Sequence, residues 1–256
     1  MRLKANHAIV AEKLRIARKV ANDLRQELGS NLIAMAVSGS VARGTAQKYS
    51  DIDMEVILRR PVPNSYRGQV VENTYCSLNC TTRQDAIREI SRPRPGLPEI
   101  LGGFTKTLQL YDPKRVFKTL EAKARHVPSR VFRRSAELAL LHSYEDFCRV
   151  KNAYLSGDDI VLRDNVNLVT HSAVWVVASL NQESFVSDRE IFKAYRRFRK
   201  LPWSFDRIEK LRYGCLKREV LFRTLVDFYL HLVDFSRKEG IRFPVERETL
   251  QELSRK

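Results

Sequence analysis

The sequence lacks long hydrophobic runs. No stretch of its 256 residues reaches the roughly 20 apolar residues that a membrane-spanning helix needs. The longest candidate, Ala173–Leu180, has the length of a buried helix segment. The N-terminus lacks the apolar core of a secretory signal, and its acidic residues argue against a transit peptide. We therefore expect a cytoplasmic protein with no membrane partner.

Cysteine and histidine are scarce. The four cysteines fit free thiols, and Cys76 and Cys80 lie four positions apart with nothing nearby to complete a zinc site. The five histidines are scattered, and the chain shows no internal repeat or low-complexity segment. With 43 % hydrophobic and 30 % charged residues, the composition is globular. A zinc module, a fibrous chain and a disordered chain are therefore excluded.

Positive charge is abundant. Forty-six basic residues against thirty acidic ones give a net charge of +16 and a pI near 9.9. The excess is spread along the chain, with +10 in residues 1–125 and +6 in residues 126–256. No tail holds the charge, so it belongs to folded surfaces. Such surfaces attract phosphates of nucleotides, nucleic acid or anionic lipid, the alternative being that the charge serves solubility alone.

Hydrophobic periodicity and turn signals divide the chain into two halves. The first half predicts helices over 4–28, 83–91 and 113–125, strands over 32–37, 52–58 and 69–78, and a mixed or strand segment over 99–110. The second half predicts only helices, over 130–155, 158–181, 188–199 and 215–239. We therefore predict an α+β protein, with a small mixed sheet and helices in a domain over 1–126 and an all-α helical bundle over 127–256.

The segment from Ser38 to Asp53 carries the strongest chemical signal. An apolar strand ends in Gly39-Ser40, where small residues allow a sharp turn and the close approach of an anion to backbone N–H groups. Arg43 adds a planar set of donors for phosphate oxygens. The turn is therefore a candidate phosphate site.

Asp51 and Asp53 follow two residues apart at a strand start. Period two puts both carboxylates on one face, roughly 7 Å apart along the strand, where they repel by about 2 kcal/mol at an effective dielectric near 20. A divalent cation relieves this repulsion, and oxygen ligands favour Mg²⁺ or Mn²⁺ over zinc. Beside a phosphate cradle, such a pair suits in-line attack on a nucleoside triphosphate. The alternative is two exposed aspartates after an ordinary turn.

Gly-Ser followed about ten residues later by Asp-x-Asp resembles the signature of the DNA polymerase β-like nucleotidyltransferases. The pattern is most similar to the aminoglycoside-adenylylating branch of kanamycin nucleotidyltransferase. Three further segments resemble that family in the same order: Gly-Gln-Val-Val-Glu ending at 72, the run over 103–112, and Glu-x₃-basic-x₂-Asn over 145–152. The resemblance covers roughly residues 35–155 and implies a polymerase β-like nucleotidyltransferase fold followed by the helical bundle.

The resemblance implies a role for each matching residue in the first half. The carboxylates of Asp51, Asp53 and Glu72 would hold two Mg²⁺ ions. The triphosphate, ATP most readily, would be held by Gly39, Ser40 and Arg43. The alternative for Glu72 is a surface residue of an edge strand.

Glu145 would be the general base that takes a proton from an acceptor hydroxyl, and Arg149, where the family has lysine, would contact the nucleotide phosphates. The resemblance also implies a homodimer with a shared active site. The alternatives are a solvated Glu145 and an i, i+4 ion pair between the two side chains.

The implied reaction transfers an NMP from an NTP to a hydroxyl and releases pyrophosphate. Leu141 and His142 stand where the family has further carboxylates, and the chain is basic. We therefore expect a neutral or anionic acceptor, an RNA end or a protein side chain, rather than a polycationic aminoglycoside.

Two other functions stay open. The segment 193–200 interleaves basic and aromatic residues, which fits nucleic-acid binding, unless the aromatic residues pack inward; the nucleotidyltransferase site would then act on RNA or be a nucleotide-binding relic. Arg/His pairs with seven residues between them suggest a helical ribonuclease or toxin–antitoxin domain only weakly; these are Arg134/His142, Arg163/His171 and Arg223/His231.

Overall fold

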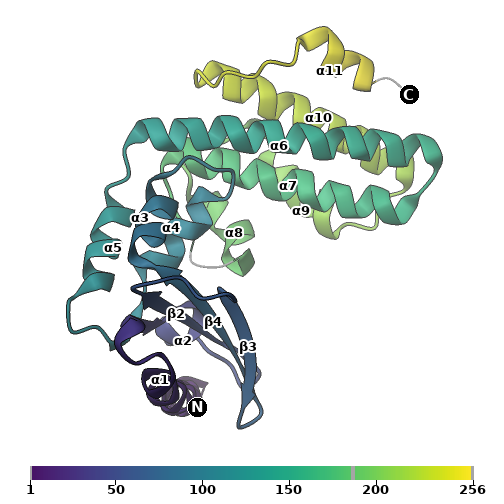
Figure 1. The fold of residues 1–256 in the computed structure, drawn as a ribbon. Coiled ribbons are helices and arrows are strands. Elements are labelled where there is room, and N and C mark those ends of the chain that lie inside the picture. Colours follow the sequence, from purple (N-terminus) through teal and green to yellow (C-terminus); the bar gives the residue numbers. More distant parts are fainter. Residues whose placement is uncertain (1, 186–187, 255–256) are drawn as a thin grey trace. The chain divides into compact units, whose positions relative to one another are not determined.

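The computed structural model describes residues 2–185 and 188–254. The chain forms two compact units (Figure 1). The first comprises Met1–Arg92 and Glu99–Val127, and the second comprises Pro93–Pro98 and Pro128–Lys256. The sheet lies in the first unit and helices make up the second. The predicted α+β class, a mixed sheet with helices followed by a helical region, is confirmed.

The first unit is built on a five-stranded mixed sheet in the order β3-β4-β2-β1-β5. The strands are β1 Leu32–Val37, β2 Ile52–Leu58, β3 Tyr66–Val71, β4 Thr74–Thr82 and β5 Leu108–Tyr111. The helices that accompany the sheet are α1 Arg2–Leu28, α2 Gly39–Ala42, α3 Arg83–Ser91, α4 Leu97–Thr105 and α5 Val116–Arg125. Strands β2 and β4 are parallel, whereas the other neighbours are antiparallel.

Helices cover the sheet on both faces (Figure 1). Helix α1 buries its apolar stripe, including Ile16 and Val20, against one face, where Met54 and Val56 of β2 also point. Helices α3 and α5 contact each other and strands β4 and β1. Because side chains alternate along a strand, the acidic residues of β2 lie on the face opposite Met54 and Val56. The strand therefore buries one row of side chains and presents another.

Two predicted segments of this unit differ from the structure. The strand expected over 69–78 is a hairpin of β3 and β4, and the segment 99–110 continues α4 and then forms β5. Helix α5 starts at Val116 rather than at 113, because the Asp112 carboxylate accepts hydrogen bonds from the N–H groups of Val116 (2.7 Å) and Phe117 (2.9 Å). Capping by a side chain four residues upstream sets this boundary.

The second unit contains three long helices, α6 Ser129–Ser156, α7 Asp159–Asn181 and α10 Arg218–Lys238. Shorter helices follow α7 and α10: α8 Asp188–Ala194, α9 Ile208–Tyr213 and α11 Arg247–Ser254. Between α6 and α7, Gly157 adopts a left-handed conformation (φ +78°), and Asp158 caps α7 by accepting from the N–H groups of Ile160 and Val161. The predicted helix 188–199 ends early at Ala194, and the one predicted over 215–239 begins at Arg218.

Aromatic side chains fill the core of the second unit. Phe147 stacks on Tyr229 with 4.3 Å between ring centroids, and Tyr154 stacks on Phe222 at 4.1 Å. The segment Pro93–Pro98 joins this unit, since the Arg94 N–H donates to Ser135 Oγ (3.1 Å).

In the basic and aromatic segment over 193–200, the aromatic side chains pack against the core, whereas basic side chains lie at the surface. Tyr195 is buried and makes an edge contact with Phe205, while Phe198 packs against the core. The exposed Arg196 and Lys200 pair with Glu209 and Glu239. The aromatic rings are therefore structural and are not presented for stacking on bases.

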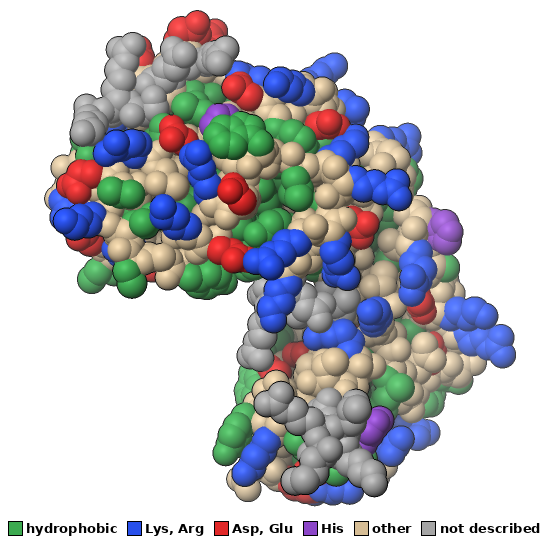
Figure 2. All heavy atoms as spheres, turned by 180° about the vertical axis from the view of Figure 1, so that it is seen from behind, with side chains coloured by type: hydrophobic (Ala, Val, Ile, Leu, Met, Phe, Trp, Pro, Cys, Tyr) green, Lys and Arg blue, Asp and Glu red, His purple; other side chains and the backbone are tan. Residues whose placement is uncertain are grey.

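Positive side chains are dispersed over the molecular surface. Figure 2 shows Lys and Arg side chains scattered over the visible face of both units and interspersed with acidic ones. Among residues 2–185 and 188–254, no helix has both the length and the apolar character that a membrane span requires.

Candidate active site

The turn between β1 and α2 packs directly against β2. Gly39 has a φ of +63°, a region that L side chains rarely adopt. A Cβ atom at Gly39 would lie 2.2 Å from Oδ2 of Asp53, so only glycine fits. The Ser38 N–H donates to the Asp53 carbonyl oxygen (2.8 Å) and ties the turn to the strand. The turn and the Asp53 carboxylate are therefore one local structure.

The two aspartates lie at the start of β2. Asp51 is exposed just before the strand, and Asp53 is half-buried as its second residue. Burial raises the pKa of Asp53 and the charge of Asp51 raises it further, whereas a hydrogen bond from Ser77 Oγ (2.9 Å) and the Arg43 charge lower it. The pair thus carries like charges that its surroundings balance only in part.

Ser40 and Arg43 complete the turn. Arg43 N–H donates to the Gly39 carbonyl, and Thr45 N–H donates to the Ser40 carbonyl (2.9 Å). Ser40 lies at the start of α2, where the first backbone N–H groups have no partner within the helix. The guanidinium of Arg43 is close enough to lower the pKa of Asp53. The structure therefore brings together the turn and the aspartates that the sequence singled out.

A further acidic residue of β2, Glu55, was missed from the sequence. It follows Asp53 at period two and accepts hydrogen bonds from Ser38 Oγ (3.2 Å) and Asn79 Nδ2 (2.9 Å). Burial raises the pKa of Glu55. The alternation of Asp51, Asp53 and Glu55 was the available signal. The partners of Glu55 come from the turn after β1 and from β4, and local patterns do not reveal the register of β4 with β2.

Glu72 does not lie in a strand, so the expected strand position is wrong. Glu72 and Asn73 form the turn between β3 and β4, both with positive φ (49° and 58°). Asp53 pairs across β2 and β4 with Ser77, and Ser77 lies four positions along the chain from Asn73, a span of roughly 13 Å. Because the hairpin turn ends the strand there, Glu72 lies at the tip rather than beside the aspartates.

Glu72 is instead engaged by α1. Its carboxylate forms an ion pair with Arg15 and another with Lys19, whose Nζ lies 3.1 Å from Oε1. The hydrogen bonds from Arg15 and Lys19 lower the pKa of Glu72 to about 2. Within the described residues, no group of three or more acidic, histidine or cysteine side chains forms a metal cluster.

Glu145 and Arg149 belong to the second unit, on α6. Arg149 Nη2 lies 2.6 Å from Glu145 Oε1, the i, i+4 ion pair that was the alternative interpretation, and both side chains are exposed. Arg149 Nη1 also lies 3.4 Å from Asp146 Oδ1. The buried Asp146, whose pKa is raised by burial, and His142 one turn earlier (3.5 Å) were not anticipated.

Residues 17–101 match the family model described as a nucleotidyltransferase domain. The first unit therefore contains a segment that is similar to nucleotidyltransferase domains. The match covers the C-terminal part of α1, the turn at Gly39, both aspartates and the hairpin. It spans 85 of the 256 residues and supports a transferase that acts on a nucleotide.

The fold of the nucleotidyltransferase domain and of the helices after it is shared with a solved structure. A nucleotidyltransferase-like protein from Exiguobacterium sibiricum 255-15 is 12 % identical to this chain with a TM-score of 0.55. The likeness covers 87 % of this chain and 75 % of that one, so it shows the fold. No curated protein matches the sequence. The closer similarity to kanamycin nucleotidyltransferase stays a prediction.

Proposed function

We propose that this chain is a cytoplasmic, Mg²⁺-dependent nucleotidyltransferase that moves an NMP from an NTP, ATP foremost, to an acceptor hydroxyl. The observation that carries the proposal is the contact between Gly39 and the Asp53 carboxylate. It holds a turn suited to phosphate beside a pair of like-charged oxygen ligands. The family match of this segment supplies the class of reaction.

The donor set fits a divalent cation. Asp51 and Asp53 offer carboxylate oxygens, which are the ligands that Mg²⁺ prefers and that Mn²⁺ accepts. Burial, and after it the charge of Asp51, raises the pKa of Asp53, so its ionised form would gain from a nearby cation. When bound there, two Mg²⁺ ions would offset the triphosphate charge and polarise the attacking oxygen. Glu72, paired at the hairpin tip, is left out of this ligand set.

In the proposed reaction, the acceptor hydroxyl oxygen forms a bond to the α-phosphorus. The bond from that phosphorus to the bridging oxygen breaks, and pyrophosphate leaves with the electron pair. Ser40, Arg43 and the N–H groups at Gly39 orient the triphosphate. Glu145 takes the hydroxyl proton, for which its exposed carboxylate is accessible.

Arg149 is proposed to contact the nucleotide phosphates, since its guanidinium is also exposed. We further propose a homodimer in which Glu145 of one copy serves the aspartates of the other. Mixing inactive Asp53→Asn and Glu145→Gln variants tests this arrangement, because a shared site restores part of the activity in the mixture. No recovery after subunit exchange contradicts it.

The acceptor is proposed to be neutral or anionic. The exposed Leu141 and His142 lie one turn before Glu145 and add no negative charge. The +16 chain repels a polycation at long range. An RNA 3′ end or a protein hydroxyl meets these conditions, whereas a polycationic aminoglycoside does not.

Calorimetric titration with each of the four NTPs, with and without Mg²⁺, tests the proposal. We expect micromolar, Mg²⁺-dependent binding that Asp53→Asn abolishes. The matched control is Asp23→Asn, which removes the same charge from the exposed side of α1. Equal binding by wild type and Asp53→Asn would contradict the metal role, and binding without transfer to any acceptor would indicate a nucleotide-binding relic.

A further inference from the structure

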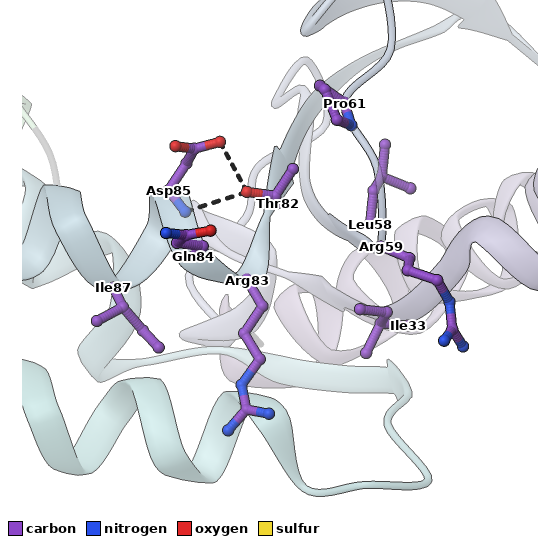
Figure 3. A pocket seen from close by; sticks show the side chains of 9 residues that line it. All are labelled: Ile33, Leu58, Arg59, Pro61, Thr82, Arg83, Gln84, Asp85 and Ile87. Carbon is purple, nitrogen blue, oxygen red and sulfur yellow. Dashed lines mark hydrogen bonds between the residues drawn. The ribbon is translucent and has the colours of Figure 1, made fainter.

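A groove of about 510 Å³ lies in the first unit, where β2 and β4 end and α3 begins (Figure 3). Leu58, in its wall, and Asp53 are five residues apart on β2, or roughly 17 Å along the strand. The groove is therefore separate from the aspartate pair. Its volume lies within the range of about 300–1,000 Å³ that is typical of small-molecule sites.

One part of the groove is apolar. Ile33, Leu58, Pro61 and Ile87 contribute aliphatic surface, and Leu58 is fully buried. These residues come from β1, β2, the loop that follows β2, and α3. A flat ring system can bury its faces against such a wall without needing matched hydrogen bonds.

The other part of the groove is positively charged. Arg59 and Arg83 line it, and neither has an acidic partner among the described residues. In the same unit, Arg67 pairs with Glu27 and Arg125 pairs with Glu121, whereas Arg59 Nε donates to the Ser30 carbonyl oxygen (3.4 Å). Two guanidinium groups without carboxylates provide donors for phosphate oxygens.

Asp85 also lines the groove but is already engaged. Its Oδ2 accepts a hydrogen bond from Thr82 Oγ1 (2.7 Å), and its Oδ1 pairs with Arg88 Nη1 (2.7 Å). Figure 3 shows the Arg59 and Arg83 side chains pointing away from Asp85. Thr82 accepts from the Asp85 N–H and thereby caps α3. The arginines, rather than the helix end, therefore supply the attraction for an anion.

We propose that this groove binds one nucleotide unit, with the base against the aliphatic wall and the phosphate between Arg59 and Arg83. A free nucleotide and a nucleotide within a single strand share this chemistry. The inference goes beyond the proposed transfer reaction and does not depend on Asp51, Asp53 or a metal ion.

The test follows isoleucine methyl signals of the full chain during titration with AMP in EDTA, which removes divalent cations. We expect the Ile33 and Ile87 methyl signals to shift, while the signal of Ile16, which lies on α1 and faces the sheet core, stays unchanged. We expect the variant Arg59→Gln/Arg83→Gln to bind AMP about tenfold or more weakly than wild type does. The matched control, Arg60→Gln/Arg92→Gln, removes the same charge from exposed residues outside the groove and binds AMP as wild type does.

Comparing different ligands on the wild-type chain tests the proposal without relying on any variant. Adenosine, which lacks the phosphate, binds at least about tenfold more weakly than AMP. A short oligonucleotide that shifts the same methyl signals at lower concentration than AMP assigns the phosphate to a strand, and the reverse assigns it to a free nucleotide. No shift of Ile33 and Ile87 with either ligand, or equal weakening in both double variants, overturns the proposal.

Loss of this site and loss of the transferase site are distinguishable. Asp53→Asn removes Mg²⁺-dependent NTP binding and leaves the AMP-induced shifts of Ile33 and Ile87 in place. Conversely, Arg59→Gln/Arg83→Gln leaves Mg²⁺-dependent NTP binding at the aspartates. Loss of both responses in Asp53→Asn contradicts the inference that the groove is a separate site.

Discussion

The carboxylates at the start of β2 and the carboxylate in the β3–β4 turn differ in how their charge is balanced. Asp53 lies beside Asp51, and burial together with that like charge raises its pKa. Glu72 lies between Arg15 and Lys19, which lower its pKa to about 2. Both sites lie in the first unit, and the sequence predicted the same metal role for both.

We interpret this difference as that between the proposed metal site and a structural ion pair. A carboxylate that is partly buried beside another carboxylate costs folding free energy in its ionised form, and a bound cation offsets that cost. A carboxylate with two cationic partners has no such need. The charge balance therefore favours Asp51 and Asp53 as metal ligands and places Glu72 among the contacts that hold α1 to the hairpin.

The largest effect is expected for Asp53→Asn. If Asp53 is a metal ligand as proposed, its loss should bring nucleotidyl transfer down to background, because bound cations would supply several kcal/mol of charge stabilisation. Without Mg²⁺ the variant should be at least as stable as wild type at pH 7, since the raised pKa means that the ionised form opposes folding. Thermal unfolding of both proteins with and without Mg²⁺-ATP measures the predicted difference in stability.

The control for that experiment is Asp23→Asn, an exposed change on α1. Mg²⁺-ATP should raise the Tm of wild type and of this control but not that of Asp53→Asn. A variant Asp53→Asn that keeps full transfer activity would remove the distinction between the two groups of carboxylates.

Much of the fold followed from local patterns. The stripe of Ile16 and Val20 predicted α1, and the apolar run over 32–37 predicted β1 with its observed bounds. The error lay at Glu72-Asn73, because a positive φ is unusual for glutamate and the surrounding run has the composition of one strand. Similarly, Asp112 moves the start of α5 by a capping contact that periodicity does not report.

In the candidate site too, the features with a local sequence signal were predicted and those that depend on distant strands were not. Spacing along the chain predicted the Gly39 turn and the Asp51–Asp53 pair, and the i, i+4 spacing anticipated the Glu145–Arg149 ion pair. It did not predict Ser77, which donates to Asp53 from a parallel neighbour strand. Such partners depend on the register between strands that are distant in the sequence. Local sequence patterns do not reveal that register.

The next largest effect is expected for Glu145→Gln. If Glu145 is the base, the turnover rate should fall by about 10²–10⁴, while NTP binding at the aspartates is retained. Steady-state kinetics at saturating NTP, together with titration of the NTP, separate the two quantities. Because Glu145 is ion-paired as Glu72 is, an unchanged rate would place it with the structural carboxylates, and Glu137→Gln on the same helix is the control.

A smaller effect on stability is expected for Gly39→Ala. The added Cβ meets Asp53 Oδ2 at 2.2 Å and takes a positive φ, which together should lower the free energy of unfolding by about 1–3 kcal/mol. Displacing the carboxylate should also weaken Mg²⁺-dependent NTP binding. Chemical denaturation and calorimetry measure the two effects.

Gly44→Ala is the matched control for Gly39→Ala. Gly44 has a similar φ of +71°, but a Cβ there meets nothing within 4 Å. The control therefore carries the backbone strain without the contact to Asp53. If both variants bind Mg²⁺-NTP equally, the contact between the turn and the aspartate is not what shapes the site.

The smallest effect is expected for Glu72→Gln. Because Arg15 and Lys19 lower the pKa of the folded-state carboxylate to about 2, the ion pairs stabilise the folded chain above the unfolded-state value of about 4.3, and this contribution is lost as pH falls towards 2. The three side chains are exposed, so Glu72→Gln should lower the Tm only slightly at pH 7, and the difference from wild type should vanish near pH 2. Nucleotidyl transfer should be unchanged. If Glu72→Gln instead abolishes transfer as Asp53→Asn does, the turn carboxylate is a metal ligand, and charge balance is not the property that separates the two groups.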